Sequence, residues 1–442
     1  MRDMLHILKN LGLRASSAVF LKGLGLLASS LAFVGCSTPA SIPDAAQWKQ
    51  DGFLMSTFCF GSSDAAIRLA KEAGLDLLEF AFSYGSTASL HQGLTVCDMI
   101  GMKSMAYDNR LLTGGGDAAN PVSEEELIRN AVREYSSHSS VMAYYLWDEV
   151  DTPNNEKVRK MTDQVRRQDP ARLAFSCLFP SYGMYNWSNS PINWENSAYA
   201  VYVDDYLKTV NPDVLCFDYY PFHQKQSTVI TNDWYRDMGL YRTKAAQYNK
   251  PFWYYYQSVD LGGPTNDLAV NITEGQIRVG MYTGLAYGAK TLSSYIAVNY
   301  MWDREGNKQP RFEEGKALIR EVKTTGNYLF DKTTKKIYHT GLPAGNYNAI
   351  YYLDDFASSD LLASAPDNLI ISVFEDGKTA TKYLLAVNKD WGNVQTGHIT
   401  LKSAKNIGKL NTGNGNVEPV STSSLTIPLN LEMGGGALYV IK

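Results

Sequence analysis

Two changes of pattern along the chain predict its fold class, an α/β barrel followed by a small all-β module. From residue 52 to about 330, short apolar runs alternate with segments that have the period of an amphipathic helix. Eight such pairs match the number and size of a (β/α)8 TIM barrel. After Lys336, short alternating runs separated by Gly, Asn and Asp turns predict an antiparallel β-sandwich. An open doubly wound sheet is the alternative, but Phe60-Gly-Ser-Ser63 is a poor phosphate-binding turn.

Each predicted element has its own local signal. The helical segments begin at residues suited to N-caps, among them Ser63, Ser123 and Thr273, the last with Gln276 positioned for a capping box. Several end at an Asn or Asp shortly before a proline. The expected barrel strands are Phe53–Phe58, Leu75–Phe80, Lys103–Tyr107, Val141–Trp147, Arg172–Phe179, Val214–Tyr219, Phe252–Tyr256 and Thr291–Ala297.

The first 36 residues have the pattern of an export signal. A basic start is followed by the short apolar run Gly23–Val34, which ends in Phe33-Val-Gly-Cys36. This ending resembles a bacterial lipobox, which implies that Cys36 is lipidated. We therefore expect a signal peptide over 1–36, a tether over 37–50, a barrel over 51–335 and a sandwich over 336–442. The expected location is the outer membrane of the cell envelope, with the periplasmic or surface side left open.

Composition narrows the class of partner. The 442 residues carry a net charge of −4 and no long basic run, so a nucleic acid or an anionic membrane surface is not an expected partner. The only membrane contact expected is the lipid anchor. Aromatic residues make up 12% of the chain and gather near predicted strand ends. Flat sugar faces stack on such rings, so the composition favours a carbohydrate ligand as well as aromatic core packing.

The stretch Val141–Glu149 is the most informative one. It is apolar and aromatic until it ends in two adjacent carboxylates, Asp148 and Glu149. In a parallel barrel the carboxyl ends of the strands carry the catalytic groups. Strict alternation along the strand would place Tyr145, Trp147 and Glu149 on one face and Asp148 on the other. We expect Glu149 to act as a proton donor, with a pKa raised by apolar walls and a neighbouring negative charge.

Four stretches together carry a family resemblance: Tyr144–Glu149, Phe217–Phe222, Tyr287–Leu292 and Leu385–Lys389. They resemble clan-A glycoside hydrolases, and more closely the β-galactosidase-like barrels found among lipoproteins of gut Bacteroidetes. The resemblance covers almost the whole chain after the signal. It implies a glycosidase that degrades plant or host glycans, with Glu149 as the general acid at the end of the fourth strand. The clan's nucleophile would close the seventh strand, where this chain has Gln257, an amide that cannot act as that carboxylate does.

Three interpretations of the missing second carboxylate stay open. Asp218, near the end of the sixth strand, could activate water in an inverting reaction. Alternatively, the adjacent Asp148 and Glu149 resemble the pair of β-hexosaminidases, in which the aspartate orients the substrate's own acetamido group. In the third interpretation the protein has lost hydrolysis and is a carbohydrate-binding lipoprotein of the envelope. A barrel that serves only as a protein-interaction scaffold would lack an aromatic pocket at the strand ends.

Further side chains near predicted strand ends are candidate sugar contacts. A salt bridge or simple packing is the structural alternative for each of them. No catalytic metal or cofactor is implied, because the histidines and cysteines lack ligand spacing. The candidate contacts are Glu79, Asp108, Trp147, Tyr220, Gln257 and Trp302.

Overall fold

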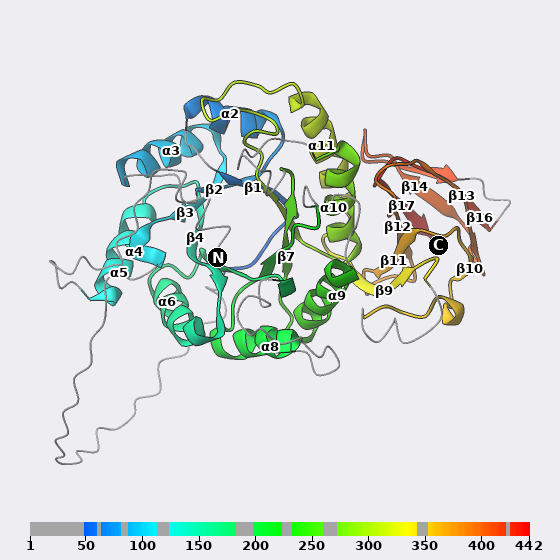
Figure 1. Ribbon diagram of the computed structural model, residues 1–442, viewed down its shortest axis with the longest axis horizontal. Helices are drawn as coiled ribbons and strands as arrows, with labels where there is room; N and C mark the ends of the chain where they lie inside the picture. Colours follow the sequence, from blue (N-terminus) through cyan, green and yellow to red (C-terminus); the bar gives the residue numbers. More distant parts are fainter. Residues whose placement is uncertain are drawn as a thin grey trace, which may run out of the picture.

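The predicted barrel is confirmed by the computed structural model. The structure describes residues 48–59, 63–80, 87–112, 123–182, 198–222, 232–259, 272–342, 352–420 and 425–442. Eight parallel strands form a closed barrel in sequence order, with β1 hydrogen-bonded to both β2 and β8 (Figure 1). These strands are β1 (Leu54–Cys59), β2 (Leu77–Phe80), β3 (Lys103–Tyr107), β4 (Val141–Val150), β5 (Leu173–Leu178), β6 (Leu215–Asp218), β7 (Phe252–Gln257) and β8 (Thr291–Tyr295).

Helices surround the barrel as an outer ring (Figure 1). The predicted caps are present: Ser63 and Ser123 accept backbone N–H bonds, and Thr273 with Gln276 forms the capping box. Helix α3 was not predicted, because its Gly, Thr, Val and Cys residues are weak helix formers and its stability comes from packing. The helices are α2 (Asp64–Glu72), α3 (Thr87–Ile100), α4 (Asn109–Leu112), α5 (Glu124–Tyr135), α6 (Asn155–Gln168), α8 (Ala198–Val210), α9 (Asn232–Gln247), α10 (Glu274–Ala286) and α11 (Phe312–Leu329).

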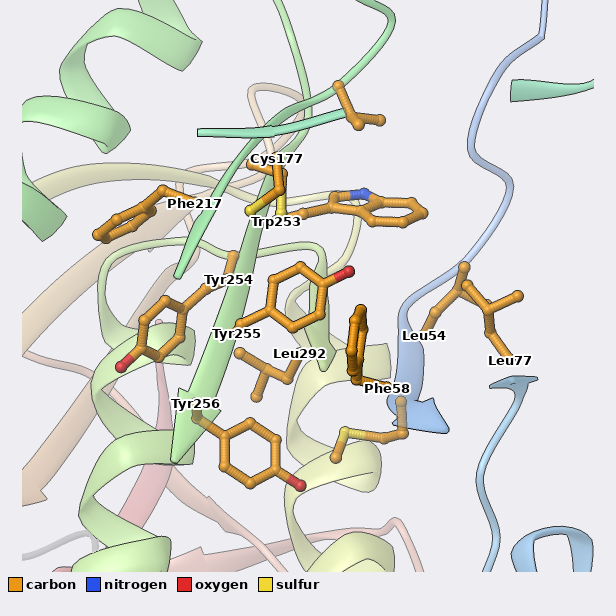
Figure 2. Packing of buried hydrophobic residues seen from close by; sticks show 14 of the residues in the cluster. Leu54, Phe58, Leu77, Cys177, Phe217, Trp253, Tyr254, Tyr255, Tyr256 and Leu292 are labelled. Carbon is orange, nitrogen blue, oxygen red and sulfur yellow. The ribbon is translucent and has the colours of Figure 1, made fainter. Parts of the chain in front are cut away.

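Aromatic side chains fill the barrel interior. Phe58 from β1 contacts Tyr145 and Tyr255, with ring centroids 6.2 Å away in both cases. Phe175 packs against Trp253 at 5.4 Å, and Figure 2 shows Trp253, Tyr255 and Phe58 lying close together inside the strands. Interlocked rings of this size leave little freedom to the strands that carry them. The barrel is therefore a packed core that holds the strand ends in fixed positions.

Residues 48–50, predicted as the end of the tether, pack against the barrel instead. The Gln50 side chain donates to the carbonyls of Gly52 and Lys290 and accepts from the Trp253 indole N–H at 2.9 Å. The Trp48 ring lies 6.3 Å from that of Trp253. Cys36 and the predicted signal peptide lie outside the described residues. Within the described part of the chain, no helix has the length and apolar character needed to cross a membrane.

The β-sandwich is also confirmed. A six-stranded sheet has the order β15-β14-β17-β12-β11-β9, and a three-stranded sheet has the order β10-β13-β16. The predicted strand Tyr347–Leu353 lies mostly outside the described residues, and Tyr352 is in a turn. The strands are β9 (Thr333–His339), β10 (Leu362–Ser364), β11 (Leu369–Glu375), β12 (Lys382–Asn388), β13 (Gln395–Leu401), β14 (Ile407–Leu410), β15 (Val417–Val420), β16 (Thr426–Leu431) and β17 (Gly436–Ile441).

The sandwich packs against the barrel through α10 (Figure 1). Gly275 lies at this contact. Glycine is needed there because a Cβ would lie only 2.2 Å from the Trp391 carbonyl oxygen. The Trp391 ring, from the sandwich, packs edge-on against Phe222 at 5.5 Å. Phe222 lies four residues after the end of β6. The sandwich therefore supports the barrel at the strand end that carries Asp218.

Candidate active site

Strand β4 ends differently from the predicted alternation. Its pairing with β5 shifts register twice, between Tyr145 and Trp147 and between Trp147 and Val150. Such bulges turn a side chain away from the face that alternation would give it. As a result the Tyr145 hydroxyl donates to Asp148 Oδ1 at 2.7 Å, so these two residues share a side. The prediction that Asp148 faces away from Tyr145 is therefore wrong.

Glu149 has a strained backbone at the same strand end. Its φ is 53°, in the left-handed region that few residues other than glycine adopt. A conformation of this kind costs on the order of 1 kcal/mol and occurs preferentially at functional sites. The Glu149 side chain is partly buried. The bulged end of β4 thus presents two consecutive carboxyl groups with different backbone geometry.

Asp148, Glu149 and Asp218 act on one another electrostatically. Burial raises the pKa of Glu149 far above its usual range, and the charges of Asp218 and Asp148 raise it further. Burial and then the charge of Asp148 raise the pKa of Asp218. Burial raises the pKa of Asp148 to about 6, although the Tyr145 hydrogen bond opposes that rise. At neutral pH, Glu149 therefore carries a proton, and the two aspartates together hold one negative charge.

Asp218 ends β6 and has a free acceptor. The residue is 7% exposed, and its Oδ1 atom has no hydrogen-bond partner among the described residues. The Tyr220 hydroxyl bonds to the carboxylate and lowers its pKa against the larger effect of burial. A buried carboxylate oxygen without a partner is unfavourable by about 1–3 kcal/mol. The atom is therefore an unused hydrogen-bond acceptor at the end of β6.

Tyrosine rings line the region of these carboxylates. Tyr220 and Tyr295 lie 4.9 Å apart, and Tyr182 meets Tyr219 edge-on at 5.0 Å. The charges of Asp148, Asp218 and Glu149 all raise the pKa of Tyr295 after burial, which places it next to the three carboxylates. Tyr182 similarly experiences Asp218 and Glu149. Sequence reasoning found Tyr220 but missed Tyr182 and Tyr295, although both lie at or just after predicted strands.

Glu79, on β2, is a further carboxyl group in the barrel interior. It is fully buried and accepts hydrogen bonds from Ser56 Oγ at 2.6 Å, Ser293 Oγ at 2.7 Å and the Tyr255 hydroxyl. No ion pair within the described part of the chain includes it. Burial raises the pKa of Glu79, and the three hydroxyls oppose that rise. Its predicted contact with a substrate stays a prediction, but its oxygens are already used by the barrel.

Two other candidate contacts lie on the barrel rim. Asp108 accepts hydrogen bonds from the backbone N–H and the guanidinium group of Arg110 and from the Tyr135 hydroxyl, and these bonds lower its pKa against the effect of burial. Trp147 is partly buried, and the Lys157 ammonium lies 5.5 Å from its ring centroid. Each side chain has a structural partner on a helix or loop outside the barrel. A substrate contact by either one stays a prediction.

The last two candidates are buried. Gln257, at the position where the family resemblance predicts a nucleophile, is 2% exposed, and its amide bonds to backbone groups in the described part of the chain. Its Oε1 accepts from the Phe222 N–H at 2.8 Å, and its Nε2 donates to the carbonyls of Phe222 and Val259. Gln257 thereby holds the segment after β6 in place. Trp302 is fully buried, so a sugar contact would require its exposure.

The carboxylate group has no described counter-charge. Among the described residues, no lysine, arginine or histidine acts on the pKa of Asp148, Glu149 or Asp218. No set of three or more His, Cys, Asp or Glu side chains in the described part of the chain is arranged to hold a metal ion. His223 lies outside the described residues. The arrangement supplies one proton donor, one negative charge and aromatic walls.

Comparison with known proteins relates the fold to one group of structures. No family model matches the chain, and no curated protein matches it. A glycoside hydrolase family 5 protein from Bacteroides vulgatus ATCC 8482 has a TM-score of 0.55 at 10% identity, covering 90% of this chain and 92% of that one. A second structure, a glycoside hydrolase, has a TM-score of 0.55 at 9% identity, covering 91% and 98%. At these identities the likeness shows the fold, a barrel and sandwich that clan-A glycoside hydrolases share.

Proposed function

We propose that this protein is a glycoside hydrolase in which Glu149 is the general acid. The observation that supports this most directly is a partly buried carboxyl group with a φ of 53° at the bulged carboxyl end of β4, and its pKa is raised by burial and by the charges of Asp218 and Asp148. Cleavage of a glycosidic bond needs a proton on the departing oxygen and negative charge near the sugar carbon that becomes positive. The fold shared with glycoside hydrolases makes the same chemistry the first one to test.

In this proposal the second carboxylate is Asp218. Its Oδ1 has no described partner, whereas Oδ1 of Asp148 is bonded to Tyr145. A water molecule can therefore donate to Asp218 Oδ1, and Asp218 can accept its proton when the single negative charge of the pair lies on Asp218 and the remaining proton on Asp148. Gln257 is a poor substitute, since its amide is bonded to backbone groups. The charge of Asp148 raises the pKa of Asp218, so Asp148 would set the pH range over which Asp218 accepts a proton.

Matched variants with aryl glycosides of graded leaving groups test this assignment. A substrate with a poor leaving group needs the acid, so Glu149→Gln should lower its kcat by roughly 100- to 10,000-fold. A dinitrophenyl glycoside needs little protonation, so the same variant should hydrolyse it almost normally. Asp218→Asn should slow both substrates. Equal losses on both substrates in Glu149→Gln would refute the acid role.

Binding separates this function from the non-catalytic alternative. An envelope carbohydrate-binding protein should bind glycans without turning over any activated glycoside, and Glu149→Gln should leave that binding unchanged. The anomeric form of the first product, observed by NMR, tests the partner. Inversion supports water activation by Asp218, whereas turnover restricted to 2-acetamido sugars with retention would support Asp148 and a substrate-assisted reaction.

A further inference from the structure

Two histidines face each other in the outer ring of helices, away from the candidate active site. His91 lies on α3, and His138 lies in the turn between α5 and β4. Nδ1 of His91 is 2.8 Å from Nε2 of His138, and the centroids of the two rings are 5.1 Å apart. The two residues are 47 positions apart in the chain, so no local sequence motif indicates the pair.

A carboxylate faces the other nitrogen of each ring. Glu134, on α5, lies 2.5 Å from Nε2 of His91, and Asp98, on α3, lies 2.7 Å from Nδ1 of His138. Asp98 also accepts from the Ser140 backbone N–H at 2.7 Å. Burial raises the pKa of both carboxyl groups, but hydrogen bonds that include those from the histidines lower it below the ordinary value. Both groups are therefore ionised at neutral pH and can only accept hydrogen bonds.

These carboxylates determine where each ring carries its hydrogen. A neutral imidazole has one N–H, and here that N–H must point at the carboxylate. Nδ1 of His91 and Nε2 of His138 would then direct two lone pairs at each other across 2.8 Å. A hydrogen bond at this distance needs one more proton between the two nitrogens. The contacts of the pair are thus satisfied by three protons on its ring nitrogens, which gives the pair one positive charge.

The same group of side chains reaches the end of β3. Glu134 accepts a second hydrogen bond, from Arg110 Nη1 at 2.8 Å. The Arg110 guanidinium donates to both oxygens of Asp108, at 3.1 and 2.7 Å. The Tyr135 ring lies 5.2 Å from the His91 ring, and its hydroxyl donates to Asp108. A continuous chain of hydrogen bonds therefore joins the histidine pair to the carboxylate that follows β3.

The charges around the pair favour the extra proton. Within the described ranges, the three carboxylates of this group bond to one arginine, Arg110, and to no lysine. Residues 81–86 and 113–122, which are next to these elements in the sequence, include no lysine, arginine or histidine. A positive charge on the histidine pair therefore has more negative than positive neighbours, and nearby opposite charge favours a protonated imidazole.

We propose that His91 and His138 form a proton-binding site, in which one shared proton makes a pH-sensitive connection between α3 and the end of α5. This role is independent of the proposed glycosidase function. In the unfolded chain each histidine takes up its proton separately at about pH 6.5. The folded pair takes up the first proton more readily than that. It takes up the second less readily, because two N–H groups cannot face each other at 2.8 Å.

The sign of the effect on stability follows from these two steps. Above about pH 6.5 the folded pair binds more protons than the unfolded chain, so its contribution to stability is lost as the pH rises. Below that pH the unfolded chain binds more protons, so the contribution is lost as the pH falls. The connection between α3 and α5 should therefore be strongest at about pH 6.5 and weaker on either side.

NMR of the full chain with histidine labelled at Cε1 tests the shared proton. In the unchanged protein the His91 and His138 signals should shift together in two separate steps. In His91→Phe and His138→Phe the remaining ring keeps its carboxylate but has no facing nitrogen. It should titrate in one step, at least about one pH unit from each step of the pair. His398→Phe, which changes an exposed histidine on β13, should leave both steps unchanged.

Urea unfolding and zinc complete the test. The stability lost in His91→Phe should be greatest at about pH 6.5 and smaller at about pH 4.5 and about pH 9, whereas the effect of His398→Phe should not vary in this way. Independent one-step titration of the two rings in the unchanged, EDTA-treated protein would overturn the inference. So would signals that move together only after one equivalent of zinc chloride is added, because the pair would then hold a metal ion. The titration of the unchanged protein decides the matter even where a variant does not fold.

Discussion

Replacing Tyr145 with phenylalanine removes the hydrogen bond that Asp148 accepts at 2.7 Å and changes little else. The hydroxyl stabilises the ionised form of Asp148, so its loss raises the pKa of that carboxyl from about 6. A hydrogen bond to a charged group contributes roughly 1.5–3 kcal/mol, and 1.36 kcal/mol corresponds to one pKa unit. The expected rise is therefore roughly 1–2 units.

The pH profile of kcat/KM is the measurement that shows this change. If turnover requires the aspartate pair in its singly charged form, activity falls as the pair takes up its second proton at low pH. The acid limb of the profile should then move to higher pH by roughly 1–2 units in Tyr145→Phe. Activity above the shifted limb should stay near that of the unchanged protein, because Tyr145 does not itself transfer a proton.

Tyr256→Phe is the matched control. Tyr256 is also a buried barrel tyrosine, but its pKa responds to burial and to Ser294 and not to the three carboxylates. Its loss should leave the acid limb where it is. Thermal unfolding of both variants shows whether either change disturbs the fold. An acid limb that stays in place in a folded Tyr145→Phe protein would refute the role of Asp148 in setting the charge of the pair.

Three more predictions concern stability and support of the site. The folded state raises the pKa of Glu149, so above about pH 4 this carboxyl ionises in the unfolded chain but not in the folded protein, and folding becomes less favourable. In urea unfolding at pH 8, Glu149→Gln should therefore be more stable than the unchanged protein by about 1 kcal/mol or more. Near pH 4 the two proteins should have similar stability. Gln257→Glu should lower the free energy of unfolding by about 1–3 kcal/mol, because a carboxylate oxygen would face the carbonyls of Phe222 and Val259. The variant should gain no activity, and increased turnover would contradict this prediction. Trp391→Ala removes the ring that packs against Phe222, so it should raise KM or lower kcat by loosening the segment after β6, and Trp391→Phe should restore part of the loss. Unchanged kinetics in a folded variant would show that the sandwich does not support the site.

Much of the architecture follows from local pattern. Alternating apolar runs and amphipathic segments predicted the barrel, and the change of pattern after Lys336 predicted the sandwich. Side-chain caps such as Ser63 and the Thr273–Gln276 box are short-range interactions, so the sequence alone indicates them. Helix α3 was missed because its residues have weak intrinsic helix propensity and depend on contacts with the barrel.

The candidate site, too, was predicted by the sequence only in part. The sequence by itself placed Asp148, Glu149 and Asp218 at the ends of strands that meet at one edge of a barrel, since parallel strands end on the same side. Only the tertiary structure decided which of them face each other, because the bulges in β4 break the two-residue period that a sequence argument assumes. It also decided that Gln257 bonds to the Phe222 segment and that Glu79 is enclosed by hydroxyls. Burial and through-space charge, which set the protonation of these carboxylates, depend on residues far apart in the chain.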